Sequence, residues 1–141
     1  MNAIKINYQL EKFNEENVCT LINSLGLNCS NYFLAMTKPS LLTVAALGAA
    51  SEFTSRYCLF CFNETKINLV LLSRLDTKKA TDIIEIPKEE ITKLKLSNVL
   101  VSYMLKVGTN NSELNFQVFK KVAHFPSVHT GINNFKIMYN L

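Results

Sequence analysis

Several features that mark common enzyme classes are missing from this sequence of 141 residues. It contains four Gly, too few to form a phosphate-cradling loop in addition to its turns. It has no G-x-G-x-x-G, P-loop, H-E-x-x-H or G-x-S-x-G motif. We therefore expect a protein that is not an enzyme, with no catalytic residues, no metal site and no cofactor.

The sequence also lacks a hydrophobic run long enough to span a bilayer. Its longest apolar stretch, residues 41–50, is interrupted by Thr43 and Gly48, whereas a spanning helix needs about 20 apolar residues. The first residues lack the apolar segment of a signal peptide. We therefore expect no transmembrane helix, a cytoplasmic location, and four cysteines that remain reduced thiols.

Composition and charge describe one folded domain with a modest basic excess. The chain shows no internal repeat or linker, and its length is typical of a single domain, residues 1–141. With 48% hydrophobic and 18% charged residues it can form its own core. The net charge of +4 is concentrated in residues 56–141. This excess favours an anionic partner, but it falls short of the basic stripe of a nucleic-acid-binding protein, so nucleic acid is not expected.

The clearest local pattern predicts a helix over residues 14–25. Asn14 is a favourable N-cap, two glutamates follow it in the first turn, and Gly26 stands just after the last turn. The apolar face of this helix consists of Val18, Leu21, Ile22 and Leu25. We expect a strand over residues 32–37 to follow it.

From Arg56 onward the pattern changes to that of β-strands. The expected strands cover residues 57–62, 67–72, 83–86, 90–96, 99–107 and 114–118. A polar loop is expected over residues 76–82, a turn near Ser97-Asn98, and a short helix after Pro126. The prediction is an α+β, mainly β fold, with an N-terminal helix, one or two early elements, a five-strand antiparallel meander and a C-terminal capping helix.

Cys58 and Cys61 form a C-x-x-C motif, which elsewhere can be a redox dithiol or half of a zinc site. Here both lie in a predicted strand, where positions i and i+3 face opposite sides, so the two sulfurs would diverge. The histidines, His124 and His129, lie much farther along the chain than those of a zinc finger. We therefore expect both cysteines to be buried and structural.

Two sets of residues are candidates for a binding surface. Those that could contact an anion are Lys78, Lys79, Lys93, Lys95, Lys120 and Lys121. If they converge they form an anion-attracting rim, and the alternative is a solvated surface that protects an edge strand from aggregation. The candidates for an apolar interface lie in residues 41–50 and are Leu41, Leu42, Val44 and Leu47.

The chain from Arg56 to Lys121 resembles the bacterial pleckstrin-homology-like (PH-like) domains in the order of its apolar segments. The segments that carry the resemblance are residues 57–63, 67–72, 86–91, 95–100, 103–107 and 116–120. The resemblance implies a PH-like core over residues 56–141. That core would be a curled antiparallel sheet of about seven strands, a PH-like barrel, capped by a C-terminal helix.

The resemblance also implies a scaffold that binds lipid headgroups, peptides or copies of itself, without catalysis. We therefore expect a domain that mediates protein interaction and associates with itself as a homo-oligomer. The alternative is a peripheral membrane module whose basic C-terminal part faces anionic lipid headgroups. Loss of lipid binding at high salt would mark this alternative, because salt screens charges on a surface.

Overall fold

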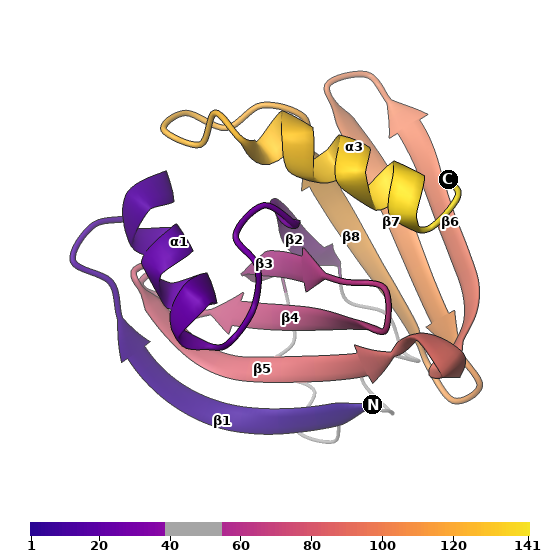
Figure 1. Cartoon of the computed structure of the whole chain (residues 1–141), viewed down its shortest axis with the longest axis horizontal. Coiled ribbons are helices and arrows are strands. Elements are labelled where there is room, and N and C mark those ends of the chain that lie inside the picture. Colours follow the sequence, from indigo (N-terminus) through magenta and orange to yellow (C-terminus); the bar gives the residue numbers. More distant parts are fainter. Residues whose placement is uncertain (39–54) are drawn as a thin grey trace.

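The computed structural model describes residues 1–38 and 55–141 (Figure 1). Within them, one eight-stranded sheet accompanies two α-helices and a 3₁₀-helix. The elements are β1 (Asn2–Gln9), α1 (Glu15–Ser24), β2 (Tyr32–Lys38), β3 (Tyr57–Phe62), β4 (Lys66–Leu72), β5 (Lys79–Pro87), η2 (Lys88–Glu90), β6 (Ile91–Val99), β7 (Ser102–Thr109), β8 (Glu113–Phe119) and α3 (Val128–Met138). The predicted α+β, mainly β class is confirmed. Leu41, Leu42, Val44 and Leu47 lie outside the described residues, so their role stays a prediction.

The strands follow the order β1-β5-β4-β3-β2-β8-β7-β6, and every neighbouring pair is antiparallel. Strands β1 and β6 stand at the two ends of this order, so the sheet does not close on itself. The predicted PH-like barrel is therefore wrong for the described part of the chain, where the sheet stays open. Figure 1 shows a bent sheet instead, with α3 lying across one face.

Strand β1 has no counterpart among the predicted elements. It pairs with β5 from Asn2↔Glu85 to Gln9↔Lys79, and most of its residues are exposed. An exposed edge strand carries little local signal, because its pairing with a distant strand stabilises it. The same pairing corrects the predicted polar loop over residues 76–82, since β5 already begins at Lys79.

The predicted N-terminal helix is confirmed with nearly the expected bounds. The Asn14 side chain accepts a hydrogen bond from the backbone N–H of Asn17 at 2.9 Å, which satisfies one of the free donors of the first turn. The predicted apolar face supplies the buried residues Val18, Leu21 and Ile22. This helix therefore follows from its local sequence.

Aromatic side chains from both parts of the sheet meet beneath α3. Phe33 of β2 stacks on Phe60 of β3, with ring centroids 4.6 Å apart. Phe135 of α3 lies edge-on to Phe60 at 5.2 Å, and Phe116 of β8 lies edge-on to the same ring at 5.4 Å. All four side chains are almost fully buried. Such pairs add about 0.5–1.5 kcal/mol each beyond the burial of their area, so this cluster joins the helix to the sheet.

The hairpin of β6 and β7 turns later than the sequence indicates. The predicted turn at Ser97-Asn98 is wrong, because both residues pair with β7, and the last pair is Val99↔Ser102. Leu100 and Val101 make the turn. Two-residue hairpin loops usually contain Gly, Asn or Asp, so an apolar dipeptide gives no turn signal.

Gly131 lets α3 approach β2 closely. A Cβ atom at this position would lie 1.8 Å from the carbonyl oxygen of Tyr32, a distance that no real contact allows. An ordinary Gly in a helix interior lowers stability by about 1 kcal/mol relative to Ala. Here the missing side chain is what permits the helix to lie on the sheet.

We predict that Gly131→Ala destabilises the protein, although the same change in an exposed helix would stabilise it. The clash with Tyr32 must push α3 off the sheet or strain the backbone, which costs about 1–3 kcal/mol or more. Urea denaturation measures the change. The control is Ile137→Ala in the same helix, where the side chain is 77% exposed and the effect should stay within about 0.5 kcal/mol. A Gly131→Ala variant as stable as wild type would contradict the prediction.

Candidate functional site

Strand β6 forms one edge of the sheet, and within the described residues it pairs with β7 alone. Leu94 and Leu96 pack against the core, whereas Lys93 and Lys95 alternate with them and are exposed. The register places Lys95 directly opposite Lys106 of β7. We call this strand with its two exposed lysines the β6 edge. It offers backbone hydrogen-bonding groups and positive charge side by side.

The six lysines predicted to contact an anion do not form one rim. Lys78 and Lys79 lie at the start of β5, where a hydrogen bond from the Lys78 backbone N–H is the main cause that lowers the pKa of Asp76. Five strands separate β5 from β6 in the sheet order, and Figure 1 shows the β4–β5 turn and β6 at opposite sides of the molecule. Lys120 and Lys121 instead follow β8, beside the β6–β7 hairpin.

The hairpin ends in an apolar tip that the sequence did not predict. Leu100 is 90% exposed and Val101 is 83% exposed. Lys120 Nζ donates to the carbonyl oxygen of Leu100 at 2.8 Å and lies 4.7 Å from the ring centroid of Tyr103. Lys136 of α3 donates to the Tyr103 hydroxyl at 2.8 Å, and this hydrogen bond lowers the pKa of Tyr103. An apolar projection with ammonium groups at its base is therefore formed by two strands and a helix.

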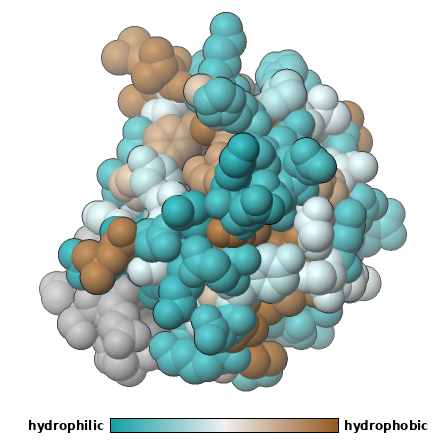
Figure 2. All heavy atoms as spheres, turned by 90° about the vertical axis from the view of Figure 1, so that its left-hand side faces the viewer, coloured by the Kyte–Doolittle hydropathy of each residue, from teal (hydrophilic) through white to brown (hydrophobic). Residues whose placement is uncertain are grey.

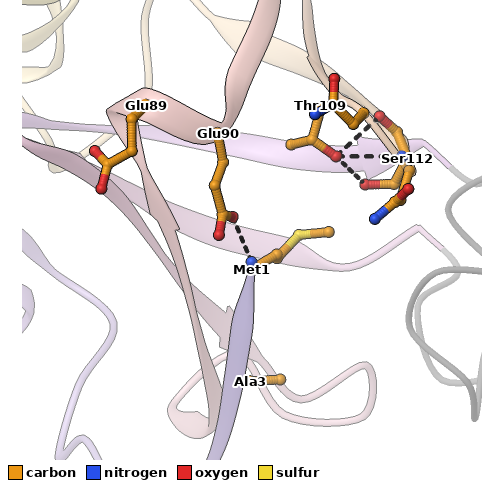
Figure 3. Close-up of a pocket in the computed structure, with 8 residues that line it drawn as sticks. Met1, Ala3, Glu89, Glu90, Thr109 and Ser112 are labelled. Atoms are coloured by element: carbon orange, nitrogen blue, oxygen red, sulfur yellow. Dashed lines mark hydrogen bonds and ion pairs between the residues drawn. The ribbon is translucent and has the colours of Figure 1, made fainter.

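A pocket of about 470 Å³ lies between the start of β1 and the β7–β8 turn (Figure 3). In it the carboxylate of Glu90 pairs with the N-terminal ammonium of Met1, and the hydroxyls of Thr109 and Ser112 lie 2.9 Å apart. Several polar groups of the pocket therefore already bond to one another. In residues 1–38 and 55–141, His, Cys, Asp and Glu form no group of three that could hold a metal ion.

A second set of charges ties β1 and β5 to Arg56, the residue just before β3. Arg56 Nη2 lies 3.4 Å from one oxygen of Asp82, and Lys5 Nζ lies 2.9 Å from the other. Burial alone would raise the pKa of Asp82, but hydrogen bonds from Lys5 and Thr81 and the charges of Lys5 and Arg56 lower it below its ordinary value. A carboxylate held ionised between two cations has a structural role here, since it fixes the β1 edge to its neighbours.

The cysteines divide into two pairs. Cys19 of α1 and Cys29 form a disulfide with their Cα atoms 5.3 Å apart, so the expectation of four reduced thiols is wrong. Cys58 and Cys61 are free and buried in β3, as predicted. Burial raises the pKa of both thiols, that of Cys61 to about 12. These two side chains therefore remain protonated and act as core residues.

No family model, no curated protein and no solved structure matches the chain. Among the helices of the described residues, none has the length and apolar character needed to cross a membrane.

We predict that thiol titration distinguishes the two cysteine pairs. In the folded protein near pH 8 a thiol reagent should react slowly with Cys58 and Cys61, because both are buried and their raised pKa keeps them protonated. Unfolding without reductant should expose two thiols, and unfolding after reduction should expose four. Four thiols without reductant would show that Cys19 and Cys29 are not joined.

Proposed function

We propose that this chain is a non-catalytic, PH-like interaction domain whose β6 edge binds an extended, acidic segment of a partner protein. The observation that carries the proposal is the position of β6. It is a nine-residue strand at the end of the sheet order, with Lys93 and Lys95 exposed along it.

The strand order supports the PH-like assignment. Strands β2 to β5 form one meander and β6 to β8 another, and the pairing of β2 with β8 joins them. These seven strands are followed by α3, whose Phe135 fills the space above the sheet. The resemblance implies about seven antiparallel strands and a C-terminal helix. The resembling residues 56–121 hold six of these strands, and β2 precedes them in the chain.

An edge strand can bind a partner by accepting one more strand. The backbone groups of the added segment pair with those of the edge, and its alternate side chains provide the specificity. On β6 the exposed face carries Lys93 and Lys95, with Lys106 of the next strand opposite Lys95. Cross-strand pairs of opposite charge are favourable, so glutamates or aspartates at alternate positions of the partner match this face.

The same charges act against pairing between two β6 strands. A second copy would bring its own Lys93 and Lys95 close to these residues, and like charges on neighbouring strands are destabilising. Lysines on an edge strand are a common device against such self-association. An acidic partner is therefore favoured over a second copy at this edge.

The test compares the wild-type chain with Lys93→Glu/Lys95→Glu in binding to a labelled eight-residue peptide of alternating Glu and Val. Fluorescence anisotropy measures the affinity at low and high salt. We expect binding that weakens with salt and falls about tenfold or more in the variant, since two favourable charge contacts become repulsive. Amide hydrogen exchange of β6 should slow when the peptide is bound.

Lys78→Glu/Lys79→Glu is the matched control, because it changes the net charge equally at the start of β5. It should keep most of the affinity. Equal losses in both variants would show that net charge, and not the β6 edge, attracts the peptide. No protection of the β6 amides would also contradict strand addition.

A further inference from the structure

The tip of the β6–β7 hairpin leaves two apolar side chains almost fully exposed. Leu100 is 90% exposed and Val101 is 83% exposed, and the adjoining Val99 is 45% exposed. Burying a Leu or Val side chain contributes about 1.5–3 kcal/mol of favourable free energy. The fold does not gain this free energy at the tip, because these side chains stay in solvent. Single exposed apolar residues are ordinary on protein surfaces. Three consecutive ones at the end of a hairpin form a projection that can enter an apolar environment.

The backbone conformation at position 100 is unfavourable for Leu. Leu100 occupies the first position of the two-residue loop with φ of 50°. Gly is the usual residue at a hairpin position with positive φ, because a side chain there is strained. Gly at position 100 would therefore suit the fold better than Leu. A large apolar side chain at this strained and exposed position contributes nothing to the core.

Two lysines lie at the base of the tip, and a third follows one of them in the chain. Lys120 donates to the Leu100 carbonyl oxygen at 2.8 Å and also bonds to the side chain of Asn98. Lys136 donates to Tyr103 at 2.8 Å, and the two ammonium groups lie 4.7 Å and 4.4 Å from the centre of that ring. Lys121 follows Lys120 and is exposed. The contacts of Lys120 and Lys136 hold their charges at the level where the apolar projection begins.

Acidic residues are scarce in this part of the molecule. Residues 91–141 contain six lysines and a single acid, Glu113. The register pairs Glu113 with Gly108 and Phe119 with Ser102, so this acid lies at the other end of β7 from the tip. Glu113 also forms an ion pair with Lys106 at 3.3 Å. The charge around the tip is therefore positive, with no nearby acid from β6, β7, β8 or α3.

We propose that this tip is a membrane-docking site for bilayers that contain anionic phospholipid. Leu100 and Val101 enter the interfacial region, the ring of Tyr103 lies near headgroup level, and Lys120, Lys121 and Lys136 face the lipid phosphates. Apolar side chains combined with basic residues at this depth are the features that peripheral membrane proteins use. Tyr is also enriched at membrane interfaces.

A bilayer fits the tip better than a second copy of the chain. Two tips in contact would bring six ammonium groups together, which like-charge repulsion opposes. An anionic bilayer instead neutralises the lysines and removes the apolar side chains from water at the same time. This site is separate from the strand addition proposed for the β6 edge, and either could fail without the other.

The first test is flotation of the full chain with vesicles of phosphatidylcholine alone or mixed with phosphatidylserine. We expect binding to the mixed vesicles, weak binding to the neutral ones, and loss of binding at high salt. Lys121→Gln should weaken binding to the mixed vesicles about fivefold, because each lysine near an anionic surface contributes that factor.

Leu100→Gly/Val101→Asn separates binding from folding. It installs a common hairpin turn and relieves the positive φ, so the variant should unfold at the same temperature as wild type or higher. Its binding to the mixed vesicles should fall at least tenfold, because both apolar side chains are gone. Leu75→Ser is the matched control, since Leu75 is 98% exposed in the β4–β5 loop and should not contribute.

A spectroscopic reporter gives a second readout. The chain contains no Trp, so Val101→Trp places a single indole at the tip. Its emission should shift to shorter wavelength with mixed vesicles and shift much less with neutral ones. The proposal is overturned if wild type binds neither vesicle or binds both equally. It is also overturned if a folded Leu100→Gly/Val101→Asn variant binds like wild type, or if Leu75→Ser loses as much binding as the tip variant does.

Discussion

The pairing of β2 with β8 is the interaction on which the rest of the structure depends. Strand β2 also pairs with β3, so it is the element that joins β5-β4-β3 to β8-β7-β6. Helix α3 lies against this junction, because Gly131 allows its backbone to approach Tyr32 and because Phe135 packs on Phe33 and Phe60. The β6 edge and its hairpin extend from the junction and owe their orientation to it. Figure 2 shows a largely hydrophilic face of the molecule, with apolar groups confined to separate spots.

Local sequence patterns predicted the elements that local interactions stabilise. Helix α1 has its cap, its acidic first turn and its apolar face within one short segment. Strand β3 is a continuous apolar run, and β4 is apolar except at Lys66 and Asn68. Strand β1 could not be found in this way, since its partner β5 lies some 80 residues away and its own residues are mostly exposed. The open sheet has the same origin, because the closure of a barrel depends on strand curvature rather than on the pattern of any strand.

Two features of the candidate sites escaped prediction for different physical reasons. The turn at Leu100 lacks the Gly, Asn or Asp that hairpin loops usually contain, so turn propensities predicted the turn at Ser97-Asn98 instead. The prediction of four reduced thiols assumed a reducing cytoplasm. The disulfide depends instead on the fold, which brings the Cα atoms of Cys19 and Cys29 to 5.3 Å from each other. In contrast, Lys93 and Lys95 were candidates for an anion-binding surface from the sequence alone, and both are exposed on β6.

The two proposed surfaces lie on one hairpin, yet their charges act separately. A strand rises about 3.3 Å per residue, so Lys95 lies about 13 Å from Val99 along β6, and Lys93 about 20 Å. Both separations exceed the screening length of about 8 Å at physiological ionic strength. Anionic lipid at the tip would therefore act mainly on Lys120, Lys121 and Lys136, and the β6 edge would keep its charge for a partner. With the tip in a bilayer, the edge would extend away from the membrane, where an extended segment of another protein can reach it.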